Sequence, residues 1–132
     1  MEPRVSYVTL GVSNLERSVR FYEKVMRFPR LPSPMTTAIF ELGRVWLVLH
    51  PRESLAGDIG VAAESTGFVG FALAHNVHSV KEVDRIVAEL EAAGTKVRKR
   101  AKAIQGGSYQ AFVEDPDGFV WEIAYHPHFP HT

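Results

Sequence analysis

The chain contains no cysteine, and this absence excludes disulfide bonds, thiolate nucleophiles and cysteine-ligated metal sites. It also carries no net charge, because fifteen basic side chains balance fifteen acidic ones. A balanced chain has no overall attraction to nucleic acid or to an anionic membrane, so we expect neither as a partner. No apolar run is long enough to span a membrane, and the N-terminal segment has no long apolar core. These absences favour a cytoplasmic protein.

What the chain does contain is enough apolar material for a folded domain. Of its 132 residues, 45% are hydrophobic and 11% are aromatic, which is typical of a globular protein with a buried core. At this length we expect one domain that covers residues 1–132.

The stretch FVEDPDGFVWEIAY, residues 112–125, contains the clearest local signal. The segment DPDG at 115–118 separates two apolar runs, and this turn chemistry is typical of a tight β-hairpin. In the second run, Glu122 lies between apolar neighbours. Because apolar surroundings disfavour a charged carboxylate, this placement suits Glu122 to proton transfer. The alternative is a buried glutamate that is satisfied by a hydroxyl or a backbone amide.

Each half of the chain shows the same order of elements. A strand is followed by an amphipathic helix with a capping-box pair at its start, and two or three further strands complete the half. The capping pairs are Ser13 with Glu16 and Ser79 with Glu82. In the first half we expect strands at 5–12, 36–42 and 45–50 and a helix to about 26; in the second half, strands at 68–74, 95–99, 109–114 and 119–125 and a helix from 80 to about 94. The sequence therefore predicts an internal duplication of a βαββ(β) unit.

The two halves also resemble each other in residue type. Residues 45–51, VWLVLHP, match residues 120–127, VWEIAYHP, with one residue added in the later copy. In this alignment Leu47 corresponds to Glu122. We place module one at about 4–50, a connector at 51–66, module two at about 67–127 and a tail at 128–132.

Three segments resemble the glyoxalase/bleomycin-resistance/dioxygenase superfamily, also called vicinal oxygen chelate proteins. They are YVTLGVSNLERSVRFY at 7–22, GFVGFALAHNV at 67–77 and FVEDPDGFVWEIAYHP at 112–127. The resemblance implies an α+β fold in which two βαβββ modules form a curved-sheet cup, paired in a homodimer. In members that catalyse, it also implies a divalent metal held by side chains from the first and last strands of each module.

Carried onto this chain, the four metal positions of the family fall on Tyr7, Leu47, Val69 or Gly70, and Glu122. Only Glu122 has a side chain that suits such an ion, and a single carboxylate binds a divalent ion poorly. We therefore expect no cofactor and disfavour a divalent metal. Tyr7 is expected beside Glu122, either as a catalytic partner or as the donor that satisfies the carboxylate. The expected ligand-binding residues are Tyr7, Thr9, Leu47, Leu49, Val69, Phe71, Tyr109 and Glu122.

Two further groups of side chains have both a functional and a structural interpretation. His126, His128 and His131 lie among prolines near the C-terminus, where we prefer a flexible surface tail to a metal site. The basic run at 98–102 is either an anion clamp or, as we favour, an edge strand protected by charge.

Three functions are open from the sequence. The leading one is a binding protein with a degenerate metal site, whose cup holds a small, partly apolar organic molecule as resistance proteins of this superfamily do. The second is a lyase, isomerase or dioxygenase of the same superfamily that depends on Glu122 or on a divalent metal. The third is a structural or partner-binding dimer with a filled cup.

Overall fold

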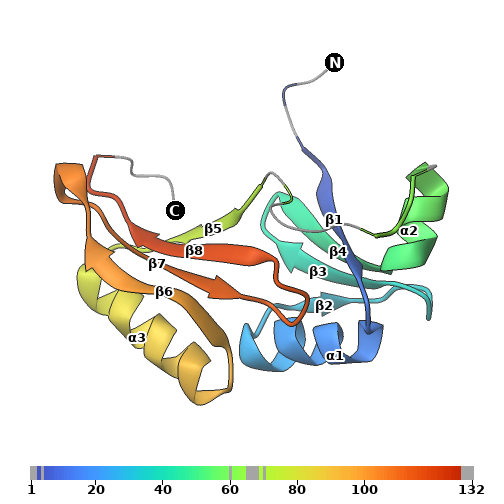
Figure 1. The fold of residues 1–132 in the computed structure, drawn as a ribbon, viewed down its shortest axis with the longest axis horizontal. Coiled ribbons are helices and arrows are strands. Elements are labelled where there is room, and N and C mark those ends of the chain that lie inside the picture. Colours follow the sequence, from blue (N-terminus) through green and yellow to red (C-terminus); the bar gives the residue numbers. More distant parts are fainter. Residues whose placement is uncertain (1–2, 4, 60, 65–68, 70, 129–132) are drawn as a thin grey trace. The chain divides into compact units, whose positions relative to one another are not determined.

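The computed structural model describes residues 3, 5–59, 61–64, 69 and 71–128. The chain divides into two compact units, Met1–Val69 and Gly70–Thr132, and each unit contains one four-stranded mixed sheet (Figure 1). The expected α+β fold with two similar modules is confirmed. The segment expected to be a connector contains a helix that its composition did not predict, α2 (Arg52–Ile59).

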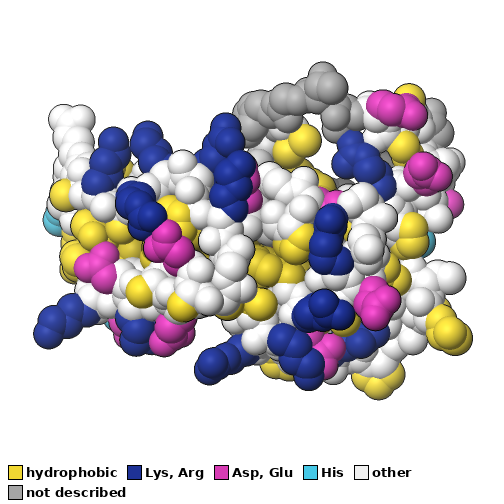
Figure 2. All heavy atoms as spheres, turned by 60° about the horizontal axis from the view of Figure 1, so that its bottom comes forward, with side chains coloured by type: hydrophobic (Ala, Val, Ile, Leu, Met, Phe, Trp, Pro, Cys, Tyr) yellow, Lys and Arg dark blue, Asp and Glu magenta, His cyan; other side chains and the backbone are white. Residues whose placement is uncertain are grey.

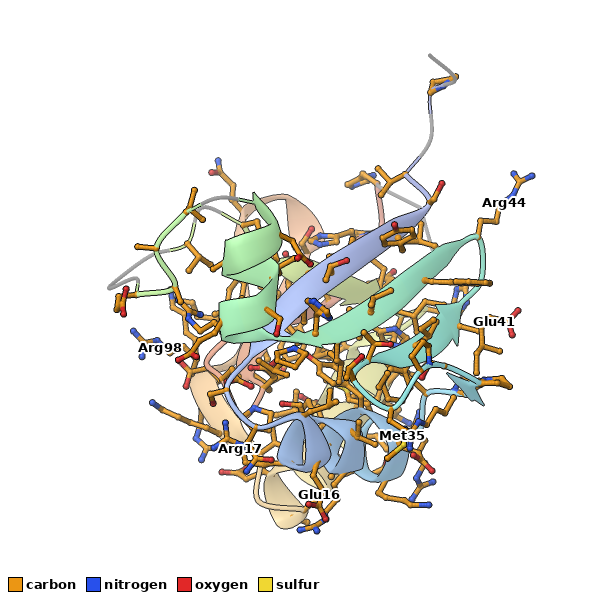
Figure 3. The ribbon with its side chains drawn as sticks, turned by 90° about the vertical axis from the view of Figure 1, so that its right-hand side faces the viewer. Glu16, Arg17, Met35, Glu41, Arg44 and Arg98 are labelled. Carbon is orange, nitrogen blue, oxygen red and sulfur yellow. The ribbon has the colours of Figure 1, made fainter. Side chains whose placement is uncertain are left out.

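The sheet of the first unit has the strand order β1-β4-β3-β2. β1 pairs with β4 in parallel, and the other pairs are antiparallel. Gly43, in the turn between β3 and β4, has a φ of +66°, a conformation that favours glycine. Figure 3 shows Arg44 of this turn and Glu41 of β3 pointing away from the sheet. The four strands are β1 (Tyr7–Val12), β2 (Arg30–Leu31), β3 (Ala38–Leu42) and β4 (Val45–Pro51).

The first helix begins one residue later than the capping-box spacing predicts. Asn14 caps α1 (Leu15–Arg20), because its side-chain oxygen accepts a hydrogen bond from the backbone N–H of Arg17 at 2.9 Å. Ser13 instead accepts a hydrogen bond from the Arg17 guanidinium. The helix continues as a π-helical segment, η1 (Phe21–Val25), and the wider turn changes which positions face the sheet. The buried residues of the two segments are Ser18, Phe21 and Tyr22.

The core of the first unit lies between its sheet and the α1–η1 helix. Phe40 of β3 packs against Tyr22 of η1, with ring centroids 6.0 Å apart, and both side chains are fully buried. The strand residues buried with them are Leu10, Val12, Ala38, Leu47 and Leu49. One face of this sheet is therefore covered by helix.

The sheet of the second unit has the strand order β5-β8-β7-β6. β5 pairs with β8 in parallel, and the remaining pairs are antiparallel. Figure 1 shows α3 (Val80–Ala92) along one face of this sheet, where it contacts β6, β7 and β8. The strand expected at 68–74 begins later, at Leu73, and Phe68 lies outside the described residues. The strands are β5 (Leu73–Asn76), β6 (Lys96–Ala103), β7 (Tyr109–Glu114) and β8 (Val120–Tyr125).

The start of α3 has the side-chain bonds of a capping box. Ser79 accepts a hydrogen bond from the backbone N–H of Glu82 at 3.2 Å. The Glu82 carboxylate accepts a bond from the backbone N–H of His78 at 2.7 Å, one residue before the cap. The predicted pairing of Ser79 with Glu82 is thus confirmed, with the return bond displaced by one residue.

The β7–β8 hairpin is held by the first aspartate of the DPDG segment. Asp115 is only 5% exposed, and its Oδ1 accepts hydrogen bonds from the backbone N–H groups of Asp117 and Phe119, each at 2.8 Å. Gly118 has a φ of +85°. The predicted hairpin is confirmed, and its register places Glu122 opposite Phe112.

The surface carries both signs of charge. In the view of Figure 2, Lys and Arg side chains are interspersed with Asp and Glu side chains, as the balanced composition leads one to expect. Among the residues that the structure describes, no helix is long and apolar enough to cross a membrane.

Candidate functional site

One face of the second sheet is covered by α3. Four side chains on this face are almost fully buried: Ala111, Val113, Trp121 and Ile123. Tyr109 lies on the same face, and its hydroxyl donates a hydrogen bond to Asp84 Oδ1 of α3 at 2.7 Å. This bond raises the pKa of Tyr109, because only the protonated phenol can donate it. We predicted that Tyr109 lines the ligand site with Glu122; the structure instead places it against the helix, on the opposite face.

The other face of this sheet, which we name the Glu122 face, consists of side chains that alternate with the buried ones. Glu122 lies opposite Ala74 of β5 and Phe112 of β7. Its side chain is half-buried, with 24% of its surface exposed. Its sequence neighbours Trp121 and Ile123 point to the helix-covered face, so Glu122 is less enclosed than their apolar character suggested. The Glu122 face is defined by Ala74, Ser108, Gln110, Phe112, Glu122 and His126.

Three polar side chains of the Glu122 face form a continuous hydrogen-bonded line. His126 Nε2 lies 3.1 Å from Glu122 Oε1, and His126 Nδ1 lies 2.9 Å from Ser108 Oγ. With a neutral imidazole and an ionised carboxylate, Nε2–H donates to Glu122 and the Ser108 hydroxyl donates to Nδ1. The line therefore links a hydroxyl, an imidazole and a carboxylate within one unit.

The position of His126 corrects a prediction. We interpreted His126 as part of a flexible surface tail, but its side chain is only 21% exposed and contacts both Ser108 and Glu122. The signal that could have found it is the period of two in a strand, because Glu122 and His126 are four residues apart and share a face if the chain stays extended. His128 is exposed, and His131 lies outside the described residues.

In the first unit, the predicted site residues do not all share a face. Leu47 and Leu49 are fully buried on the side of the sheet that the helix covers. The register places Trp46 opposite Tyr7 and Val48 opposite Thr9. Trp46 and Val48, not Leu47 and Leu49, therefore accompany Tyr7 and Thr9. Leu47 and Glu122 therefore lie on different faces relative to the covering helices, so their alignment does not match equivalent positions.

The third predicted position also differs from the structure. Val69 and Phe71 precede β5 and are exposed, so neither pairs with β8. Phe71 packs against Phe119, with ring centroids 5.9 Å apart. Ala74 takes the place opposite Glu122, while the alternative Gly70 lies outside the described residues. Ala74, the residue of β5 opposite Glu122, has no side chain that could ligate an ion.

Tyr7 and Glu122 belong to different units of the chain. Tyr7 is 57% exposed at the start of β1. Its expected hydrogen bond to Glu122 stays a prediction.

The basic run at 98–102 lies on β6, which is an edge strand of the second sheet. The Arg100 guanidinium binds the Glu91 carboxylate at 2.6 Å, and Arg98 lies 3.4 Å from Glu114. The bond to Arg100 lowers the pKa of Glu91. These ion pairs favour the interpretation of a charge-protected edge for the two arginines.

Whether the described residues could hold a metal can be tested on their donor atoms. Glu122 and His126 supply one carboxylate and one imidazole. Across residues 3, 5–59, 61–64, 69 and 71–128, no group of three or more His, Asp or Glu side chains lies close enough together to hold a metal ion. Protein sites for zinc and similar ions use about three or four donors. Within the second unit, Glu122 and His126 alone are therefore fewer donors than such a site uses.

Comparison with known proteins gives a consistent relationship. Residues 4–123 match the model of the Glyoxalase/Bleomycin resistance protein/Dioxygenase superfamily. A glyoxalase-related enzyme from Fulvimarina pelagi has a crystal structure with a TM-score of 0.88 and 32% identity, covering 99% of this chain and 94% of that chain. The metallothiol transferase FosB of Shouchella clausii is 27% identical, over 90% of this chain and 77% of its own length. The lactoylglutathione lyase GLX1 of Arabidopsis thaliana is 29% identical, and the match spans 43% of its length.

The names of these relatives correct one expectation. We expected no cofactor and disfavoured a divalent metal, yet relatives from Shouchella clausii and Bacillus licheniformis are named metallothiol transferases. The expectation is wrong at the level of the family, because metal chemistry occurs among proteins that match nine-tenths of this chain. With a family model that spans residues 4–123 and a solved relative similar over nearly its whole length, the chain belongs to the glyoxalase/bleomycin resistance protein/dioxygenase superfamily.

Proposed function

We propose that the Glu122 face binds a small, partly apolar organic molecule, with Glu122 as its polar anchor. The observation that carries this proposal is the hydrogen-bonded line of Ser108, His126 and Glu122 beside the ring of Phe112. A few placed polar groups among apolar side chains are typical of small-molecule sites. The side chains of His126 and Glu122 are 21% and 24% exposed. Neighbouring residues therefore hold them in place, and a ligand from solvent can still contact them.

Lysine side chains beside the Glu122 face indicate which kind of ligand the face could bind. The register places Lys99 opposite Phe112 and Lys102 opposite Gln110, so both lysines lie beside the Glu122 face. A ligand with an apolar body and an anionic end would contact Phe112 and a lysine together. Relatives named lactoylglutathione lyase supply a first probe of this kind, since lactoylglutathione carries carboxylates.

The test is binding of S-lactoylglutathione and of fosfomycin, measured by ligand-observed NMR and calorimetry. Fosfomycin is included because a protein with a similar fold is a fosfomycin resistance protein from Listeria monocytogenes. Glu122→Gln should weaken binding of S-lactoylglutathione, which carries N–H and O–H donors, by about tenfold or more, as expected when a charged hydrogen-bond acceptor is lost. The matched control is Glu91→Gln, because Glu91 lies on α3 and is paired with Arg100. Equal affinities of the wild type and Glu122→Gln would contradict the anchoring role.

A second candidate function is catalysis by the same face. His126 lies 3.1 Å from Glu122, and a carboxylate beside an imidazole can accept a proton from a bound substrate and pass it on. A lyase or isomerase that depends on Glu122 would interconvert S-lactoylglutathione and the adduct of methylglyoxal with glutathione. Loss of this turnover in Glu122→Gln, with Glu91→Gln active, would support it; full turnover in Glu122→Gln would exclude it.

A further inference from the structure

Ser108 lies in a turn that leaves space around it. It follows Gly106 and Gly107, which have φ values of +87° and +83°. A Cβ added to Gly106 would meet nothing within 4 Å, and one added to Gly107 would meet only Pro127 Cγ, at 3.5 Å. Both positions favour glycine, because other residues rarely adopt a positive φ. Few atoms therefore lie next to the backbone immediately before Ser108.

The side chains that contact Ser108 are arranged like those that activate the hydroxyl of a catalytic serine. Its Oγ lies 2.9 Å from His126 Nδ1, and the other ring nitrogen lies 3.1 Å from Glu122 Oε1. A nucleophile within hydrogen-bond reach of a base, with the base oriented by a third group, is the arrangement by which enzymes activate serine. Such a set is recognised by its geometry and roles, and not by the order of its residues in the chain.

The location of Ser108, His126 and Glu122 differs from that expected of a network that only satisfies polar groups in the core. They lie on the face of the sheet opposite to α3, whose buried residues contact the other face. The side chains of His126 and Glu122 are 21% and 24% exposed. A network that only satisfied core polar groups would be expected to be enclosed.

We propose that Ser108 is a nucleophile for acyl transfer, with His126 as its base and Glu122 as the group that orients His126, so that this face hydrolyses small activated esters. The proposal shares Glu122 with the proposed binding site but does not require that either probe named above binds. The two ideas can therefore fail separately.

The reaction balances with water as the only co-reactant. Ser108 Oγ attacks the ester carbonyl carbon while its proton passes to His126 Nδ1, and the alcohol departs with that proton when the C–O bond of the ester breaks. Water then attacks the acyl group and gives a proton to His126. The bond from carbon to Ser108 Oγ breaks, the proton returns to Ser108, and a carboxylic acid leaves. Glu122 accepts the Nε2–H bond throughout and stabilises the imidazolium.

The experiment uses diisopropyl fluorophosphate, a probe whose phosphorus is attacked by activated serines with loss of fluoride. The full chain is incubated with the probe, and the labelled residue is located by peptide mass spectrometry. We expect one label, on Ser108, and none on Ser108→Ala. His126→Gln should label about 100-fold more slowly, the contribution typical of a general base. Ser33→Ala should label like the wild type, because Ser33 Oγ donates to the Thr37 carbonyl and has no histidine partner in that bond.

A comparison within the wild type keeps the test decisive if a variant fails to fold. Folded protein should label at Ser108 at least about 100-fold faster than urea-unfolded protein, in which the base is no longer positioned. Absence of the label, a label on other residues alone, or equal rates in folded and unfolded protein would overturn the proposal. Binding of S-lactoylglutathione to the wild-type protein distinguishes the two proposals, because that measurement does not depend on labelling of Ser108.

Discussion

The phenol of Tyr109 ties strand β7 to helix α3 through Asp84. Because the bond is made by the protonated phenol, the pKa of Tyr109 is raised from its usual value of 10.0. A raised pKa in the folded state means that the stabilisation is present at neutral pH and is lost as the pH rises through the folded-state pKa. We predict that Asp84→Asn shifts the ultraviolet titration of Tyr109 to lower pH. Making the same change in a Tyr125→Phe background removes the signal of one other tyrosine from the ultraviolet titration. An unchanged titration of Tyr109 in Asp84→Asn would contradict the assignment.

Single residues show what local patterns can and cannot predict about the site. The hairpin chemistry predicted the turn and the strand that carries Glu122, because these signals depend only on neighbours in sequence, but it did not predict how exposed Glu122 is. His126 was missed because the proline after it indicated an irregular tail. Leu47 was placed on the wrong face because the sequence match between the halves does not determine which residues share a face, and the actual register depends on strand pairing across the sheet.

At the scale of elements, the N-terminal caps of helices α1 and α3 can be compared directly. Ser79 accepts a bond from the Glu82 N–H, whereas Ser13 leaves the corresponding role to Asn14. We predict that Ser79→Ala and Asn14→Ala each lower the free energy of unfolding by about 1 kcal/mol. Ser13→Ala should cost less than about 0.5 kcal/mol, since its bond to Arg17 is exposed. Urea denaturation measures all three, and equal losses in Ser13→Ala and Asn14→Ala would contradict the observed cap.

The hairpin between β7 and β8 depends on the Asp115 carboxylate. Asp115→Ala leaves the backbone N–H groups of Asp117 and Phe119 without this acceptor, and we predict a loss of about 1–3 kcal/mol in the free energy of unfolding. Asp115→Asn keeps a side-chain oxygen and should lose less. Since the hairpin sets the register of Glu122, Asp115→Ala should also weaken any ligand of the Glu122 face. A variant as stable as the wild type would show that the turn is held by other groups.

Most strands and both amphipathic helices could be predicted, because hydrophobic periodicity and caps are local signals. Several elements were not, and η1 and α2 are two of them. The π-helical segment η1 lies where the sequence predicted a regular helix, and nothing in its composition indicates this wider turn. Helix α2 has almost no separation of apolar and polar sides, so the segment gave no periodic signal.

At the scale of the whole molecule, we predict a homodimer, which the family resemblance implies. Exposed apolar side chains on β1 and β4 of the first unit give this prediction a physical basis, since Tyr7 and Trp46 lie opposite each other and are 57% and 43% exposed. Light scattering after size-exclusion chromatography should give twice the chain mass of 14.7 kDa. Trp46→Lys should shift the mass toward one chain, with Met35→Lys as the exposed control. A wild-type mass of 14.7 kDa would contradict the prediction.

In each unit the first strand pairs in parallel with the last, as β1 does with β4 and β5 with β8. Each sheet is also drawn from one continuous stretch of chain, and the first sheet is complete by Pro51. During synthesis on a ribosome, the first sheet can therefore assemble before the last strands of the second sheet have been translated. Within a unit, the hairpin of the last two strands closes a short loop, while the parallel pair must wait for a much longer one. We thus expect the hairpins to form early and the first strand to dock late.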